Sequence, residues 1–165
     1  MVIRSLVNWL ASRARKRPCT TLVMHSTAGS SLSGALSALR AKELSYHALI
    51  EKSGQVTKCV PYSRVAYHAG KSEGPEGDNV NNYSVGISFV NLNDGVDKLT
   101  DEQISAAEDL AMALKRQFPT LKWVTNHHCI SPGRKFDPRR FDLQSFGAKV
   151  GLEPWKLTRA AWRLW

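Results

Sequence analysis

Short apolar segments with the character of buried strands alternate along this chain with segments of helical periodicity. The strand-like segments include the runs at 19–25, 83–90 and 121–125. Between the last two, residues 101–118 repeat apolar side chains at steps of three and four, with Thr100 as N-cap and Gln103 at the capping-box position. This alternation predicts an α/β or α+β chain with one central sheet.

Three further segments have recognisable patterns. Residues 32–39 place leucine and alanine at helical spacing and predict a second helix. Residues 45–51 and 55–60 predict the two strands of a hairpin, with Gly54 in the turn between them. The stretch 70–82, rich in glycine, acids and amides, predicts a long loop of the kind that often carries function.

Both ends of the chain are expected to be helical. Residues 1–17 predict an amphipathic helix that Pro18 ends. Residues 153–165 predict a basic amphipathic helix with Pro154 in its first turn and tryptophans opposite the basic stripe. That apolar face either docks onto the protein or inserts among anionic lipid headgroups.

The chain of 165 residues has a net charge of +9. Such a charge favours polyanionic partners, namely nucleic acid, anionic lipid or the phosphate-rich surface of a bacterium, or it serves solubility alone. No nucleic-acid-binding motif accompanies the charge, so we expect no nucleic-acid partner. The sequence contains neither an apolar run of the ~18 residues that a membrane span needs nor an export signal, and we expect a cytoplasmic product.

Histidines follow two of the predicted strands. His25 ends the run 19–25, and His127 follows 121–125 in a segment that also contains Asp137. Two imidazole nitrogens and one carboxylate oxygen could hold zinc and leave its fourth tetrahedral position to water, which is the arrangement of catalytic zinc sites. The spacing alone leaves a structural role open for a histidine at the end of a strand.

Five short motifs occur along the chain in a fixed order. They are the strand ending in His25; Ser45-Tyr46-His47; Tyr67-His68-Ala69-Gly70; Asn82 with Ser84-Val85-Gly86-Ile87; and His127 with Pro132-Gly133-Arg134-Lys135-Phe136-Asp137-Pro138. In these motifs the chain resembles the type 2 N-acetylmuramoyl-L-alanine amidases, which include phage lysozyme-like amidases, bacterial recycling amidases and animal peptidoglycan-recognition proteins. The resemblance covers about residues 20–142, the expected core of a single amidase domain spanning 1–165.

The resemblance implies a single central mixed β-sheet flanked by helices, with a zinc site in a surface groove. It places Zn²⁺ on His25, His127 and Asp137. The phage and animal branches have cysteine at the position of Asp137, so this carboxylate indicates the recycling branch. Cys129 lies nearby in the sequence and is either an alternative ligand or a buried apolar residue.

The resemblance also implies catalytic and substrate-binding residues. Lys135 resembles the family residue beside the metal-bound water, where an ammonium would stabilise an oxyanion, and Tyr46 resembles the tyrosine that orients the attacking water. His68 and Asn82 are expected to line the groove for the peptide stem, with a donor role behind the metal ligands as the alternative for His68. Ser88 stands where the recycling branch has a glutamate, which shifts the expected proton transfer to Tyr46 and Lys135.

The expected function is hydrolysis of the amide between N-acetylmuramic acid and L-alanine in peptidoglycan. The basic charge and the expected C-terminal helix favour a phage-type endolysin, which accumulates in the cytoplasm, acts on the cell wall after release and approaches an anionic or outer-membrane surface. The alternatives are a cytoplasmic recycling amidase that acts on soluble muropeptides and a non-catalytic peptidoglycan-binding protein. In each case we expect a monomer.

Overall fold

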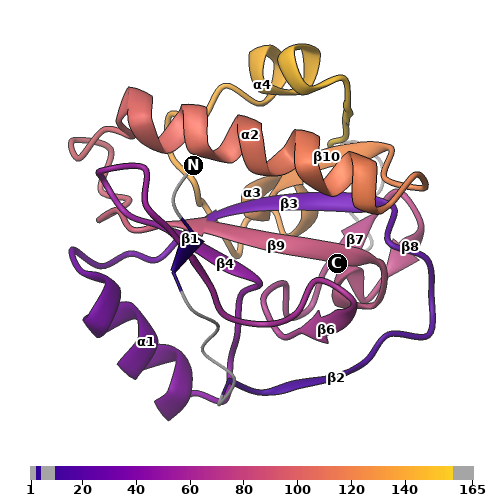
Figure 1. The fold of residues 1–165 in the computed structure, drawn as a ribbon, viewed down its shortest axis with the longest axis horizontal. Helices are drawn as coiled ribbons and strands as arrows, with labels where there is room; N and C mark the ends of the chain where they lie inside the picture. Colours follow the sequence, from indigo (N-terminus) through magenta and orange to yellow (C-terminus); the bar gives the residue numbers. More distant parts are fainter. Residues whose placement is uncertain (1–2, 5–9, 158–165) are drawn as a thin grey trace.

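A computed structural model describes residues 3–4 and 10–157 of the chain. Its centre is a seven-stranded sheet in the order β1-β5-β4-β9-β3-β10-β11 (Figure 1). These strands are β1 (Ile3–Arg4), β3 (Thr21–Ser26), β4 (Ala48–Ile50), β5 (Val56–Lys58), β9 (Ser84–Phe89), β10 (Trp123–Asn126) and β11 (Glu153–Pro154). Two small sheets pair β2 (Ser12–Ala14) with β6 (Arg64–Ala66) and β7 (Glu73–Gly74) with β8 (Gly77–Asp78).

The helices are α1 (Leu32–Ala41), α2 (Asp101–Gln117), α3 (His127–Ile130) and α4 (Leu143–Val150), with a 3₁₀ turn, η1, at Val80–Tyr83. The predicted capping box of α2 is confirmed, since Thr100 Oγ1 accepts from the Gln103 amide and Gln103 Oε1 accepts from the Thr100 amide. Within the ranges described, none of the helices has the length and apolar character of a membrane span.

The sheet is mixed because one pair of strands is antiparallel. β4 and β5 form the predicted hairpin, whereas β4, β9, β3 and β10 pair in parallel. Gly54 in the hairpin turn has φ +78°, and a Cβ atom there would lie 2.8 Å from the carbonyl oxygen of Glu102. Only glycine suits both the backbone conformation and this close approach.

The two faces of the sheet have different covers, and this positions the candidate site. α2 and α4 lie on one side of the sheet and α1 lies on the other (Figure 1). Leu22 and Met24 of β3 pack in the core beneath α2 and α4, while Val23 packs in a separate cluster with Val80 and Ile130. Because side chains alternate along a strand, His25 emerges on the face of Val23, away from the main core.

The helix predicted over 1–17 is wrong in the part that the structure describes. β1 pairs with β5, and β2 pairs with β6. The Arg15 guanidinium secures the segment, since its Nη2 donates to the carbonyl oxygens of Arg64 at 2.7 Å and Ser84 at 2.9 Å. Strand partners far along the chain supply the backbone hydrogen bonds, and helical periodicity cannot reveal such partners. Residues 1–2 and 5–9 of the predicted helix lie outside the described residues.

The helix predicted over 153–165 is wrong over 153–157. β11 pairs in parallel with β10, and the Trp155 amide continues the ladder by donating to the Val124 carbonyl at 2.8 Å. Thr125 Oγ1 also donates to the Trp155 carbonyl at 2.9 Å. The edge of β10 therefore holds this segment extended. Residues 158–165 lie outside the described residues.

Candidate metal centre

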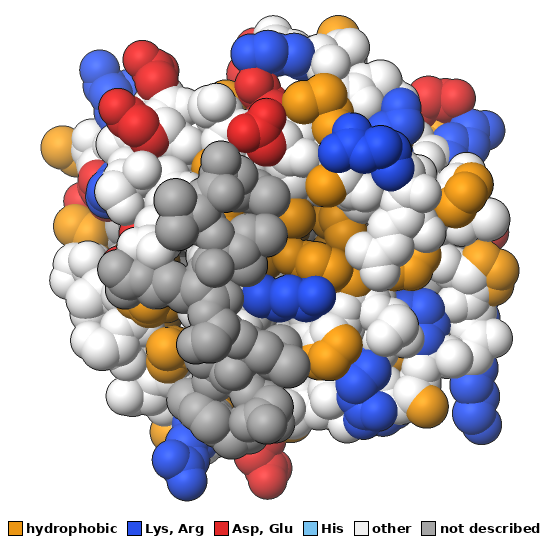
Figure 2. Space-filling view, viewed as in Figure 1, with side chains coloured by type: hydrophobic (Ala, Val, Ile, Leu, Met, Phe, Trp, Pro, Cys, Tyr) orange, Lys and Arg blue, Asp and Glu red, His pale blue; other side chains and the backbone are white. Residues whose placement is uncertain are grey.

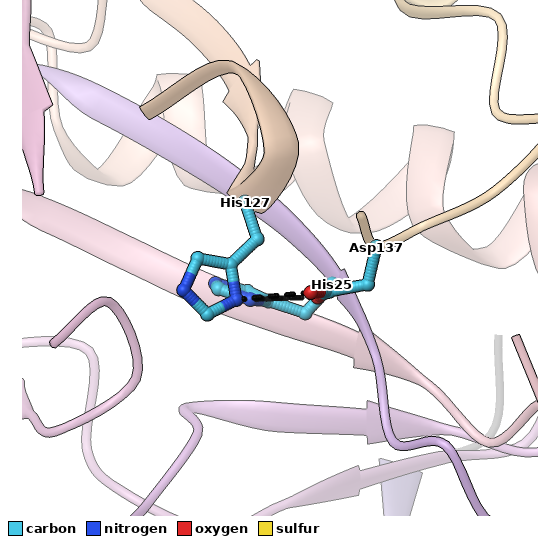
Figure 3. Close-up of side chains that lie close together, drawn as sticks. All are labelled: His25, His127 and Asp137. Atoms are coloured by element: carbon cyan, nitrogen blue, oxygen red, sulfur yellow. Dashed lines mark hydrogen bonds and ion pairs between the residues drawn. The ribbon is translucent and has the colours of Figure 1, made fainter. Parts of the chain in front are cut away.

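The structure brings His25, His127 and Asp137 together from three separate elements. His25 lies near the end of β3, His127 is the first residue of α3, and Asp137 lies in the loop between α3 and α4. Their side chains point toward one another (Figure 3). His25 Nδ1 lies 3.3 Å from Asp137 Oδ2, and His127 Nδ1 lies 3.2 Å from Asp137 Oδ1. All three residues are buried, and one candidate ligand atom from each lies within 4.8 Å of the others.

The hydrogen bonds of His127 determine which of its ring nitrogens carries the proton. His127 Nε2 lies 3.2 Å from the carbonyl oxygen of Ala69. A carbonyl oxygen can only accept, so Nε2 carries a hydrogen, and Nδ1 is the nitrogen that can offer a lone pair to an ion. Nδ1 faces the Asp137 carboxylate, with Oδ2 at 3.3 Å, and a bound cation could link the two groups in place of a proton.

His25 is placed in a similar way. Its Nε2 lies 2.9 Å from His68 Nδ1, and its Nδ1 lies 3.3 Å from Asp137 Oδ2. This buried Nδ1 makes no well-formed hydrogen bond among the described residues, and such a nitrogen is costly unless something binds it. It converges with His127 Nδ1 and the Asp137 carboxylate on the same space.

The charge states of His25 and Asp137 match those of metal ligands. Burial and the neighbouring His127 lower the pKa of His25 to about 4, so its ring is neutral at pH 7. Burial alone would raise the pKa of Asp137, but hydrogen bonding to the facing His127 and His25 outweighs it and holds that pKa well below its usual range. Two imidazoles and one ionised carboxylate fit a zinc ion with one open position.

A cavity of about 250 Å³ opens beside the three residues. Its wall includes His127, Asp137, Tyr46 and Lys135, and α1 supplies much of the remainder. The centre of the Tyr46 ring lies 5.0 Å from that of His25. Burial and the nearby Asp137 carboxylate raise the pKa of Tyr46, so its side chain stays a phenol at neutral pH.

A family profile described as N-acetylmuramoyl-L-alanine amidase matches residues 15–140. The chain belongs to this amidase family. Among curated proteins, the 1,6-anhydro-N-acetylmuramyl-L-alanine amidase AmpD of Escherichia coli K12 is 34% identical over 114 residues, 67% of this chain and 60% of that protein. AmpD of Salmonella typhimurium LT2 is 33% identical over 117 residues, 68% of this chain and 60% of that protein. The chain therefore spans about 60% of the length of these relatives.

Solved structures of amidases share the fold. A crystal structure of a selenomethionine AmpD derivative aligns with a TM-score of 0.74 and 24% identity, covering 88% of this chain and 93% of the other. The amidase AmiD from E. coli, in complex with the substrate anhydro-N-acetylmuramic acid-L-Ala-D-γ-Glu-L-Lys, aligns with a TM-score of 0.72 and 28% identity. That alignment covers 87% of this chain and 62% of AmiD. The mixed sheet flanked by helices, predicted from the resemblance to the amidases, is thus confirmed.

The two residues expected to line a groove for the substrate of this amidase domain are absent from the wall of the cavity. His68 is buried and hydrogen-bonds His25 through Nδ1 and Ser84 Oγ through Nε2, at 2.9 and 3.1 Å. This contact matches the alternative place, behind a candidate metal ligand. The role of Asn82 stays a prediction; its side chain accepts a hydrogen bond from Arg13 of β2.

The adjacent asparagine was not predicted from the sequence. Asn81 Oδ1 accepts from the amides of His68 and Ala69 at 3.1 and 2.9 Å, so Asn81 belongs to the surroundings of the candidate metal centre. Both asparagines belong to one motif, but the η1 turn, which no pattern in the sequence predicts, decides where each of them points. Asn93 and Lys42 in the cavity wall were likewise not predicted, because they lie outside the five motifs. Cys129 does not join the cluster of candidate ligands among the residues described.

Proposed function

We propose that this chain is a zinc-dependent N-acetylmuramoyl-L-alanine amidase that hydrolyses the amide between the lactyl group of anhydro-N-acetylmuramic acid and L-alanine. One observation carries the proposal: the buried side chains of His25, His127 and Asp137 bring one ligand atom each to within 4.8 Å of the others beside a cavity. The names of the relatives and the muropeptide in the AmiD complex support this substrate class.

His25, His127 and Asp137 would hold the ion. Zinc bound by three protein ligands supplies a Lewis acid and a water whose pKa is lowered to about 7. His25 and His127 keep their Nδ1 lone pairs for the ion because His68 and Ala69 engage the opposite ring nitrogens. The three residues therefore need little rearrangement to bind.

Lys135 stabilises the transition state in this proposal. It lies two residues before Asp137 and contributes to the same cavity wall. An ammonium group there offsets the negative charge that develops on the amide oxygen as the carbonyl carbon becomes tetrahedral. Because Lys135 has this role only once the charge develops, its removal should affect kcat more than KM.

Tyr46 orients the attacking water. Since its pKa is raised, the phenol donates or accepts a hydrogen bond rather than acting as a phenolate base. Ser88 lies opposite His25 in the register of β3 and β9, and its hydroxyl is buried beside the Tyr46 side chain. Without a carboxylate at this position, positioning of the water falls to Tyr46.

The endolysin interpretation is the second candidate, and the net charge of +9 is the observation that favours it. The curated relatives favour the alternative instead, because they are named as amidases of 1,6-anhydro-N-acetylmuramyl-L-alanine. We therefore propose soluble anhydro-muropeptides as the first candidate substrate and the intact cell wall as the second. The proposed membrane contact rested on a C-terminal helix that the structure does not show over 153–157.

Mass spectrometry of the products tests the function. Purified protein is incubated with anhydro-N-acetylmuramic acid-L-Ala-D-γ-Glu-L-Lys and, separately, with purified sacculi, each with and without a chelator. We expect free tripeptide and anhydro-N-acetylmuramic acid from the soluble substrate, loss of both products on chelation, and recovery with Zn²⁺. Release of stem peptides from sacculi alone would favour the endolysin. No cleavage of either substrate by zinc-loaded protein would leave a peptidoglycan-binding protein.

A further inference from the structure

Both partners of the metal-binding histidines come from one short segment of the chain. His68 offers its side chain to His25 Nε2, and the next residue, Ala69, offers its carbonyl oxygen to His127 Nε2. The orientation of two ligands therefore depends on the placement of one dipeptide, His68–Ala69. If this dipeptide shifts, both imidazoles lose the group that fixes their tautomer and ring plane.

Asn81 fixes the His68–Ala69 dipeptide from one side. Its Oδ1 accepts from the amides of both His68 and Ala69. A single side-chain oxygen thus holds the backbone amides of two consecutive residues. The first, His68, contacts His25 through its side chain, and the second, Ala69, contacts His127 through its carbonyl oxygen. Asn81 is half-buried and lies in the η1 turn directly before β9, so its own backbone is anchored to the central sheet.

Arg134 fixes the same dipeptide from the other side. Its Nη2 donates to the Ala69 carbonyl at 3.1 Å and to Ser131 Oγ at 2.8 Å. The Ala69 carbonyl therefore accepts from Arg134 and from His127 together. Gly70 has φ +58°, and a Cβ atom built on it would lie 3.4 Å from Arg134 Nη2, so the guanidinium packs closely against the backbone of Gly70.

We infer that Asn81 and Arg134 are positioning residues of the metal centre. They hold the His68–Ala69 dipeptide in place, so that both histidine ligands present Nδ1 to the ion. This inference rests on the metal centre of the proposed function. In this arrangement His25 Nε2 donates to His68 Nδ1, and His68 Nε2 donates to Ser84 Oγ. Neither positioning residue needs to touch the substrate.

The neighbouring asparagine offers a matched control. Asn82 has the same side chain and lies in the same turn, but it bonds Arg13 rather than the 68–69 segment. Asn81→Ala removes the shared acceptor, whereas Asn81→Asp keeps an oxygen in its place. For Arg134→Gln, the control is Arg139→Gln, because the exposed Arg139 lies in the same loop, donates its backbone amide to Asn93 Oδ1 and places its guanidinium over the Phe136 ring, away from the 68–69 segment.

The test is zinc affinity, measured by competition with a chromogenic chelator, together with the visible absorption spectrum of the Co²⁺-substituted protein. Outer partners of metal ligands typically contribute about 10–100-fold to metal affinity. We expect Asn81→Ala to weaken zinc binding by an amount in that range and to alter the Co²⁺ spectrum. Arg134→Gln should also weaken zinc binding and alter the Co²⁺ spectrum. We expect wild-type zinc affinity and a wild-type spectrum from the three controls, Asn81→Asp, Asn82→Ala and Arg139→Gln.

Wild-type zinc affinity and an unchanged Co²⁺ spectrum in Asn81→Ala would overturn the inference while leaving the proposed function intact. If the wild type itself binds no zinc, the inference and the proposed function both fail. Thermal unfolding of the metal-free variants separates a general loss of stability from a loss of positioning, because lower stability alone does not change the Co²⁺ spectrum of the folded protein. Should Asn81→Ala fail to fold, Arg134→Gln decides, since Arg134 is exposed at the surface.

Discussion

At the scale of single residues, the proposed metal centre depends on which nitrogen of each histidine carries a proton. The Ala69 carbonyl faces Nε2 of His127, and His68 faces Nε2 of His25. The Asp137 carboxylate then faces the Nδ1 atoms of both histidines at 3.2 and 3.3 Å. With both Nδ1 atoms unprotonated, such a buried set is unfavourable without a cation and becomes favourable when one binds.

Asp137→Asn tests this electrostatic argument. The amide removes the negative charge and turns an acceptor into a partial donor while keeping the shape of the side chain. We expect the loss in zinc affinity to exceed the roughly 10–100-fold contributed by outer partners, and hydrolysis to fall with it. Metal content by atomic emission checks the result against Asp109→Asn, an exposed aspartate of α2. Full zinc occupancy in Asp137→Asn would contradict the assignment.

Lys135→Met tests the role of the ammonium group. Losing one stabilising group of an oxyanion typically lowers kcat about 10²–10³-fold, and we expect that loss with unchanged zinc content. Steady-state kinetics on the soluble muropeptide separates kcat from KM. Lys42→Met is the contrast, since Lys42 lines the same cavity from the end of α1 and should affect KM at most. Equal losses of kcat in the two variants would argue against a specific role for Lys135.

At the scale of elements, the ends of strands position the chemistry. β3 and β10 are parallel neighbours in register, with Asn126 opposite Met24. Their ends therefore bring His25 and His127 to the same edge of the sheet, and the ring centres lie 4.6 Å apart. α2 stabilises this arrangement from the far face, where Gln103 Nε2 donates to the carbonyls of Ile50 and Val90.

Thr100→Ala should weaken the start of α2. Thr100 caps the helix and also donates to the Lys52 carbonyl at 2.7 Å. Loss of such a cap costs about 1 kcal/mol, and we expect the free energy of unfolding in urea to fall by roughly that amount or slightly more. Ser105→Ala, an exposed change within the same helix, should not destabilise the protein. Equal unfolding free energies in the two variants would show that the cap contributes little.

Elements with strong local patterns could be predicted from the sequence, whereas elements defined by distant partners could not. α2 has apolar periodicity and a capping box, and the hairpin has its turn glycine, so both were predicted correctly. β2 and β11 are extended only because β6 and β10 offer them hydrogen bonds. At the site, the resemblance to the amidases predicted the three candidate ligands, but only the folded turn η1 distinguishes Asn81 from Asn82.

At the scale of the whole molecule, metal binding should be linked to folding. An ion that binds only the folded state stabilises it, by about 2.7 kcal/mol at a hundredfold excess over Kd. We therefore expect Zn²⁺ to raise the Tm of the wild type and a chelator to lower it. Differential scanning calorimetry of Asp137→Asn is the control, and we expect it to show little response. A similar rise in both proteins would mean that zinc binds elsewhere.

The basic charge also acts over the whole molecule. Lysine and arginine side chains lie at several separate places on the face shown in Figure 2 rather than in one patch. A net charge of +9 acting through such a surface should promote binding to the anionic wall only at low salt. Co-sedimentation with sacculi should therefore weaken as salt rises, while hydrolysis of the soluble muropeptide changes little. Sedimentation that resists salt would point to a specific wall-binding surface and favour the endolysin.

The measurement that bears most directly on the central claim is a crystal structure of the zinc-loaded protein with anomalous diffraction at the zinc edge. We predict one strong peak among His25 Nδ1, His127 Nδ1 and an Asp137 carboxylate oxygen, at ligand distances of about 2.0–2.2 Å. A fourth ligand from solvent should face the cavity that Tyr46 and Lys135 line. A peak elsewhere, for example at Cys129, or none in zinc-saturated protein, would contradict the account.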